Sequence, residues 1–138
     1  MCETLLIKNR VSRLGRRSYA YRMNVAGRTG YSSAQLARLN RELDSLYELI
    51  YADWNTVTEE DYAAFGPQLV ILIQTLRQLH SECRKLSDRS LRSEIDRLGM
   101  NYSALYELNS DIVNYRVNAP HDNELQSMMA KASQMLNK

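Results

Sequence analysis

The stretch Tyr62–Leu86, YAAFGPQLVILIQTLRQLHSECRKL, decides the fold, because its apolar residues recur at steps of three and four without a break. That spacing places the apolar side chains on a single face and predicts an amphipathic helix from about residue 58 to residue 86. The seam consists of Tyr62, Phe65, Leu69, Leu72, Leu76, Leu79, Cys83 and Leu86. Gly66-Pro67 interrupts its early part, so we expect either a kink or a new helix start with Pro67 in the first position.

Three further segments carry a helical period. Residues 33–54 place leucine and isoleucine at steps of three and four, and residues 90–117 repeat them every seven residues. A last helix is expected to start after Asp122 and to run to about Leu136. Residues that can cap the other helix starts precede them: Ser32 or Ser33, Thr58 with Asp61, and Ser87 or Asp88.

Four amphipathic helices with short connections predict an all-α protein, folded as an antiparallel four-helix bundle. A long two-helix coiled coil with flanking helices is the alternative architecture. The tetrapeptide LYEL occurs at residues 46–49 and again at residues 105–108, an offset of 59 residues. This recurrence indicates either two related helical hairpins or a chance agreement between leucine-rich helices.

The formal net charge of +2 conceals a division of the chain near Gly30. Residues 1–30 hold seven basic residues and one acidic residue, whereas residues 31–138 carry a net charge of −4. The first segment also lacks a long apolar period. We therefore interpret residues 1–30 as a basic N-terminal arm, with a short helix around Thr4–Leu14 as an open option, and residues 31–138 as the helical bundle domain.

The basic segment is the strongest functional signal in the sequence, because arginines alternate there with tyrosines. Arginine pairs with phosphate groups and tyrosine stacks on bases, so residues 8–28 are candidate nucleic-acid contacts. The same charges fit an acidic protein surface, either the chain's own acidic stretch at 42–61 or that of a neighbouring subunit. The candidate contact residues are Arg10, Arg13, Arg16, Arg17, Tyr19, Tyr21, Arg22 and Arg28.

A second candidate surface lies on the helix at 58–86, where Val70, Ile71 and Ile73 fall outside the main seam. A helix that is apolar on more than one face is either central in its fold or in contact with another molecule. We interpret these three residues as a candidate partner interface.

The sequence contains no phosphate-binding loop, nucleophile elbow or dinucleotide fingerprint. His80 and Cys83 lie one helical turn apart, but a structural zinc site needs four ligands and the chain has only two histidines and two cysteines. We therefore expect no catalytic residue, no metal and no cofactor. Cys2 and Cys83 are expected to stay unpaired, as in a reducing cytoplasmic compartment. The longest apolar run has five residues, so no membrane span is expected.

These patterns favour a non-enzymatic helical interaction module, an adaptor or structural subunit that acts through a protein partner or through self-association. A nucleic-acid-binding accessory protein that holds phosphates with its arginines is the first alternative. An enzyme with a site in the bundle core is the second alternative.

Overall fold

The computed structural model describes residues 3–29 and 31–118, and every regular element among them is helical, which confirms the all-α class. Two short 3-10 helices, η1 (Trp54–Thr56) and η2 (Arg89–Leu91), precede the third and fourth long helices. The long helices are α1 (Thr4–Ala26), α2 (Ser33–Tyr51), α3 (Glu59–Arg84) and α4 (Arg92–Asn118). The predicted last helix, residues 122–136, lies outside the described residues.

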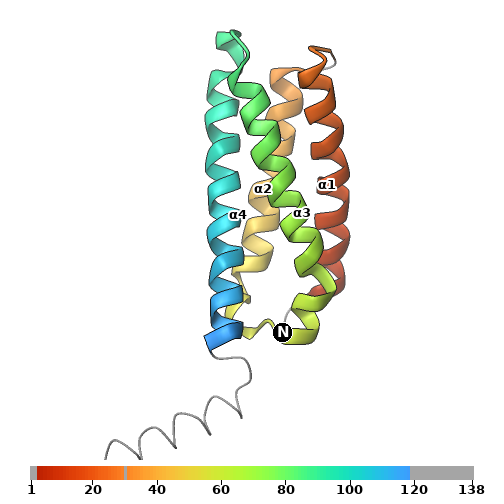
Figure 1. Ribbon diagram of the computed structural model, residues 1–138, viewed down its shortest axis with the longest axis vertical. Helices are drawn as coiled ribbons and strands as arrows, with labels where there is room; N and C mark the ends of the chain where they lie inside the picture. The colour runs from red at the N-terminus through yellow and green to blue at the C-terminus, as the bar shows by residue number, and fades with distance from the viewer. Residues whose placement is uncertain (1–2, 30, 119–138) are drawn as a thin grey trace, which may run out of the picture.

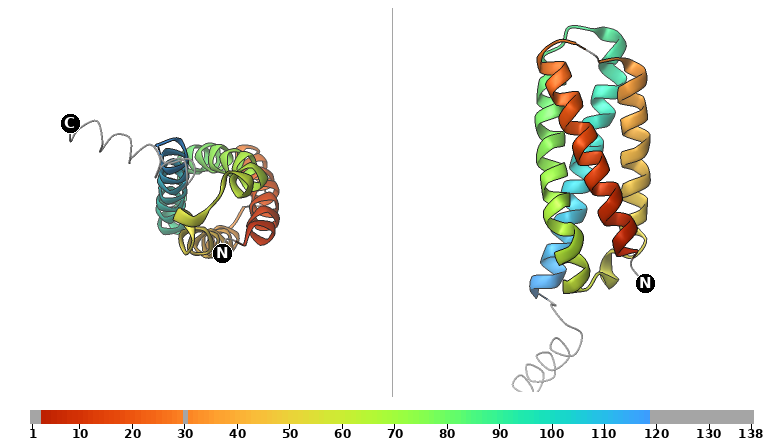
Figure 2. Two further views of the ribbon diagram at one scale, coloured as in Figure 1. Left: turned by 90° about the horizontal axis from the view of Figure 1, so that it is seen from below. Right: turned by 90° about the vertical axis from the view of Figure 1, so that its right-hand side faces the viewer.

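The four long helices lie side by side and form a square when they are viewed end on (Figures 1 and 2). Helix α1 contacts α2 and α3, and helix α4 also contacts α2 and α3. The pairs α1–α4 and α2–α3 therefore face each other across the core (Figure 2).

Contacts near the helix ends show that neighbouring helices include two parallel pairs. The Thr4 hydroxyl at the start of α1 donates a hydrogen bond to Asp61 at the start of α3, at 2.5 Å. Tyr115 near the end of α4 meets the ring of Trp54, just beyond the end of α2, with ring centroids 5.8 Å apart. The chain thus forms a first hairpin, α1–α2, and a second hairpin, α3–α4, which are stacked with like helices parallel (Figure 1).

This arrangement differs from the expected antiparallel neighbours. The helices α2 and α3, which follow each other in the chain, lie diagonally, because the connection at 52–58 crosses the end of the square (Figure 2). The packing of the second hairpin against the first determines which helices are neighbours. The lengths of the connections alone do not predict these neighbours.

The expected basic arm is wrong for residues 4–26, which form helix α1. Ile7, Val11, Leu14 and Val25 belong to the core and are at most 2% exposed, and Ser18 is fully buried beside them. These positions are separated by four, three, four and seven residues, a helical seam that the surrounding arginines disguise. The charge boundary near Gly30 is therefore not a boundary between an arm and a folded domain.

Helix α3 runs from Glu59 to Arg84 without a break, so neither a new start nor a separate short helix forms at Pro67. The predicted capping box of Thr58 and Asp61 is confirmed, and it satisfies first-turn amides that the helix itself leaves unpaired. Ser32 caps α2 by accepting a hydrogen bond from the Gln35 amide at 3.2 Å.

One core runs the length of the described helices. It includes Cys83, as predicted, and also Ile73, which is only 6% exposed. The expected partner patch is therefore corrected to Val70 and Ile71, which are 37% and 51% exposed. None of the helices in the described part of the chain combines the length and the apolar character needed to cross a lipid bilayer.

Substitutions at two glycines, one in α1 and one in α3, test whether these segments are packed helices. Space is open around a Cβ at Gly15 in α1, whereas a Cβ at Gly66 in α3 would overlap the ring of Tyr62. The Tyr62 hydroxyl donates to Asn109 of α4 at 2.6 Å, so moving that ring would break a contact between helices.

We expect Gly15→Ala to raise the free energy of unfolding by about 0.5–1 kcal/mol, because alanine loses less backbone entropy in a helix. Gly66→Ala should lower it by about 1 kcal/mol or more, despite the same gain in helix propensity. Urea denaturation followed by circular dichroism measures both changes. An unstructured arm would leave Gly15→Ala without effect.

Candidate functional site

The strongest candidate site is a groove between α1 and α2, which we call the arginine groove. It encloses about 400 Å³ on the outer side of the first hairpin. Because the two helices are antiparallel, the first half of α1 lies beside the middle of α2. The lining residues are Arg10, Arg13, Leu14, Arg38, Arg41, Glu42 and Ser45.

Helical periodicity explains why these arginines gather in one place. Arg10, Arg13 and Arg17 stand at steps of three and four, on a side of α1 adjacent to its buried seam. Arg38 and Arg41 stand at the same spacing on α2. Burial of the apolar seams therefore aligns two basic stripes along a single groove.

Among the described residues that line the arginine groove, Glu42 alone carries a carboxylate. Glu42 pairs with Arg17 of α1 and lies 3.6 Å from the Arg38 side chain. No ion-pair partner is found for Arg10, Arg13 or Arg41 within residues 3–29 and 31–118. One carboxylate among several guanidinium groups leaves an excess of positive charge that favours an anionic ligand.

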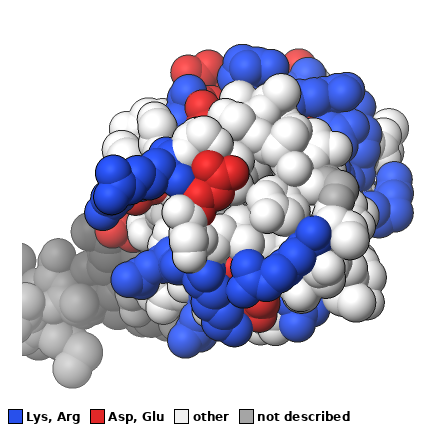
Figure 3. Space-filling model, turned by 90° about the horizontal axis from the view of Figure 1, so that it is seen from above, with Lys and Arg blue, Asp and Glu red and all other residues white. Residues whose placement is uncertain are grey.

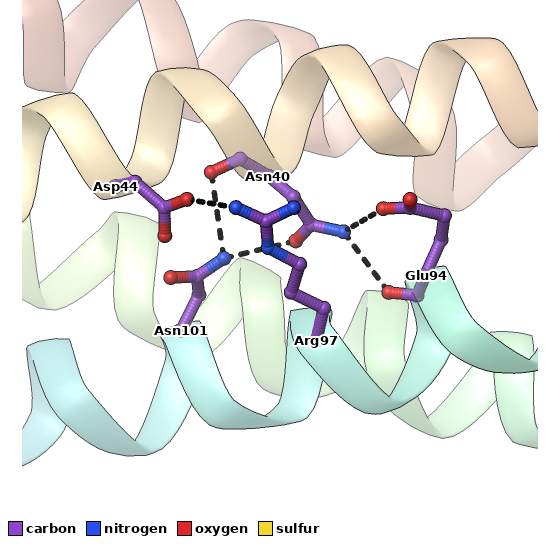
Figure 4. A network of polar contacts seen from close by, with 5 residues as sticks. All are labelled: Asn40, Asp44, Glu94, Arg97 and Asn101. Atoms are coloured by element: carbon purple, nitrogen blue, oxygen red, sulfur yellow. Dashed lines mark hydrogen bonds and ion pairs between the residues drawn. The ribbon is translucent and has the colours of Figure 1, made fainter.

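The interface between α2 and α4 shows how the corresponding surface of the second hairpin is covered (Figure 4). Asn40 of α2 is fully buried, and its side-chain amide donates to the backbone carbonyl and the carboxylate of Glu94 at 3.0 and 2.9 Å. Asn101 of α4 donates to the Asn40 side-chain carbonyl at 3.0 Å. Arg97 of α4 donates to Asp44 of α2 at 2.5 Å. Arg97 and Asn101 of α4 thus hold α2 through the carboxylate of Asp44 and the side-chain carbonyl of Asn40.

Arg38 and Arg97 occupy equivalent positions in the two hairpins. An offset of 59 residues superposes the burial pattern of α2 on that of α4: Leu36, Leu39 and Leu46 become Ile95, Leu98 and Leu105, all of them buried. The same offset relates Arg38 to Arg97. Arg97 faces the preceding hairpin, whereas Arg38 faces outward from the first hairpin. The arginine groove is therefore the surface against which a preceding helix would lie.

The structure brings together only part of the predicted contact set. Arg10 and Arg13 line the groove, Arg17 pairs with its Glu42, and Arg16 lies on the outer side of α1. Tyr19 is 55% exposed, and Tyr21 packs partly against the core.

The other two predicted arginines lie away from the groove. Arg22 lines a separate cleft with Arg77 and Glu82 of α3. Arg28 closes the turn after α1 with a φ of 56°.

The sequence analysis did not identify Arg38 and Arg41, because both lie beyond residue 30, in the segment whose net charge is negative. The signal that identifies them is their spacing of three on a helix whose apolar seam is already assigned. Only the pairing of α1 with α2 shows that they face Arg10 and Arg13.

A second basic region lies at the end of the molecule that holds the hairpin turns, where Lys and Arg occupy much of the rim (Figure 3). A cleft of about 370 Å³ beside the α3–α4 turn is lined by Arg84, Arg89 and Arg92. Asp88 and Asp96 line the same cleft, so its charge is more balanced than that of the arginine groove.

His80 and Cys83 lie one turn apart on α3, and the described residues place no further ligand set around them. Among the described residues, no group of three or more His, Cys, Asp or Glu side chains is arranged to hold a metal ion. Burial lowers the pKa of His80, an effect that Arg84 reinforces and Asp96 opposes. Burial, together with the charge of Glu82, raises the pKa of the Cys83 thiol to about 11. A buried thiol with a raised pKa is a poor nucleophile.

No family model, no curated protein and no solved structure matches this chain.

The buried asparagine pair is expected to be essential for the hairpin–hairpin interface. Asn40→Ala should lower the free energy of unfolding by about 1–3 kcal/mol, because Asn101 loses its acceptor in a buried site. Asp44→Ala should lower it by about 1 kcal/mol or less, since the pair with Arg97 is partly exposed to solvent. Urea denaturation compares the two variants, and equal losses would contradict the assignment.

We also expect Cys83 to react slowly with thiol reagents at pH 8, because little thiolate forms that far below a pKa of about 11. In a Cys2→Ser variant, Ellman's reagent should titrate Cys83 slowly in buffer and rapidly in denaturant. Equal rates in the two conditions would show that the thiol is accessible.

Proposed function

We propose that this chain is a non-enzymatic interaction module, a four-helix bundle of two stacked hairpins, that binds an acidic helical segment of a protein partner in the arginine groove. It serves as an adaptor or structural subunit of a larger assembly. The single observation that carries the proposal is the arginine groove itself, in which one glutamate lies among arginines of α1 and α2.

The groove suits an acidic helix because its basic groups come from two long helices with a shallow channel between them. An approaching helix can place carboxylates along both stripes, and each arginine offers a planar fork that matches a carboxylate. Arg10, Arg13 and Arg41 lack ion-pair partners within the described part of the chain, so binding breaks only the contacts of Glu42.

The contact between Arg97 and Asp44 is an internal precedent for this mode of binding. Arg97 binds a helix that carries an aspartate, and Arg38 holds the equivalent position on the outer hairpin. The proposed partner would thus take the place that α2 occupies relative to α4.

Nucleic acid is the second candidate ligand, and one observation favours it. Helix α1 contains no acidic residue, and its Lys8, Arg13 and Arg16 side chains are exposed. Several exposed basic residues on one helix suit contacts to a phosphate backbone, which give salt-dependent binding with little sequence selectivity.

A binding experiment separates the two ligands. The probes are a fluorescent helical peptide with Asp or Glu at every third and fourth position and a 20-nucleotide single-stranded RNA. Fluorescence anisotropy at low salt should show binding of the peptide, and Arg38→Glu with Arg41→Glu should weaken it by at least about tenfold through charge repulsion.

The matched control is the pair Arg89→Glu and Arg92→Glu, which changes the net charge equally but lies beside the other cleft. The control should leave peptide binding within about threefold of the parent chain, a change of less than 1 kcal/mol. Equal losses in both pairs, or no peptide binding at low salt, would overturn the proposal.

Arg16→Ala distinguishes the ligands further, because Arg16 lies on α1 outside the arginine groove. RNA binding that drops with Arg16→Ala but persists in the Arg38 and Arg41 variant would support the nucleic-acid candidate instead.

A further inference from the structure

Helix α4 carries carboxylates on its exposed side, beside a groove between α3 and α4. Glu107 lines that groove, and Asp111 lies one helical turn further along α4. Both side chains are exposed, and neither has an ion-pair partner within residues 3–29 and 31–118. Residues 93–115 include one basic residue, Arg97, which is engaged with Asp44 of α2. The exposed side of α4 is therefore acidic beyond residue 97.

The basic groups of α3 lie toward the other end of this groove. Arg84 lines it together with Asp96, and both residues also line the cleft beside the α3–α4 turn. Asp96 is thus close to an arginine of its own chain, whereas Glu107 lies eleven residues further along α4, about 16 Å away. Glu107 and Asp111 are the carboxylates that remain for contact with another molecule.

These α4 carboxylates and the arginine groove lie on different hairpins, on their outer sides. The arginine groove belongs to α1 and α2, Glu107 lines a groove of α3 and α4, and the two hairpins lie side by side (Figure 2). The two faces carry charges of opposite sign, and the bundle between them keeps them from meeting within one molecule. Such faces match when one copy of the chain stacks on the next, in a head-to-tail association.

The repeat of the hairpins gives this contact a defined register. Within the chain, Arg97 of α4 reaches Asp44 of α2. The offset of 59 residues relates Arg97 to Arg38, and it relates Asp44 to Ser103. When α2 of a second copy packs on α4 in the way that α4 packs on α2, its Arg38 lies over Ser103. Serine is small, so the two helices can approach closely there.

Glu107 supplies the carboxylate that Ser103 lacks. It lies four residues beyond Ser103, about 6 Å along the helix, and Arg41 lies three residues beyond Arg38, about 4.5 Å along its helix. Arg41 of the second copy therefore comes to the level of Glu107. Guanidinium and carboxylate groups at that level form a charge-assisted contact.

We propose that the acidic helix bound by the arginine groove is α4 of a second copy of this chain, so that copies stack head to tail. The inference rests on the proposed function and names the partner of the same groove. Each copy offers one groove and one acidic helix, so the stack continues beyond a dimer as concentration rises. The contacts are exposed ion pairs, so salt weakens the association.

The first test is the mass of the full chain in solution, measured by static light scattering at low salt. The weight-average mass of the parent chain should increase with concentration to at least about twice that of the monomer, and high salt should reverse the increase. A groove variant, Arg38→Glu with Arg41→Glu, and a helix variant, Glu107→Lys with Asp111→Lys, should each need at least about tenfold higher concentration for the same mass. Far-UV circular dichroism checks that both variants remain folded.

Mixing the two variants tests the polarity of the contact. The groove variant keeps its acidic α4, and the helix variant keeps its arginine groove, so one intact interface forms between them. The mixture should therefore give a one-to-one dimer that does not grow further. All four substitutions in one chain reverse both faces together, and they should restore the association of the parent chain.

The matched control is the pair Arg89→Glu and Arg92→Glu, which changes the net charge as much as the groove variant does. It should associate within about threefold of the parent concentration, because both residues line the cleft beside the α3–α4 turn. An equal loss in the control would overturn the proposal, as would association that persists in either variant or a mixture that stays monomeric.

The peptide experiment separates this inference from the proposed function. A parent chain that is monomeric at every concentration, but whose groove still binds the acidic peptide, would overturn the second copy as partner and leave the proposed function standing. A monomer whose groove also fails to bind the peptide would overturn both.

Discussion

The stacked arrangement depends on the buried contact between Asn40 and Asn101. A side-chain amide without partners in an apolar interior destabilises the folded state, so α2 and α4 are held in the one register in which both asparagines and Glu94 are satisfied. Apolar seams alone tolerate sliding by a turn. The polar pair therefore determines which turn of the second hairpin meets which turn of the first, and with it the placement of Arg97 on Asp44.

The repeat of two hairpins also explains the distribution of charge. Each helix buries its seam, and in the second hairpin one flank beside the seam also faces the first hairpin. In the second hairpin this flank is occupied, so Arg97 finds a carboxylate on α2. In the first hairpin the same flank faces outward, and its arginines form the groove with Glu42 as their only carboxylate. The excess positive charge follows from the position of the hairpin in the stack as well as from composition.

Periodicity predicted the helices at α2, α3 and α4 well, since leucine-rich seams with serine, threonine and aspartate caps leave little ambiguity. It failed for α1, whose seam contains Ser18 and a glycine at position 15 and whose exposed positions are crowded with arginines. The sequence predicted only part of the arginine groove. Its pattern of basic residues identified Arg10 and Arg13, whereas Arg38 and Arg41 lie beside them only because α1 packs on α2. The position of α3 relative to α2 was the feature that the sequence predicted least well. The connection at 52–58 is equally compatible with α3 as a neighbour of α2 or as its diagonal partner.

The outer face of a terminal repeat is polar in any case when solvent covers it, and none of the described residues 3–29 and 31–118 packs over the arginine groove. A surface that only contacts solvent is best composed of interspersed charges of both signs. The cleft beside the α3–α4 turn has this composition, since it is lined by Arg84, Arg89, Arg92, Asp88 and Asp96. The arginine groove departs from that pattern. Guanidinium groups crowded around one glutamate repel one another, and this repulsion destabilises the isolated chain. An anionic helix in the groove would relieve it, and this relief is the physical basis of the proposed binding function.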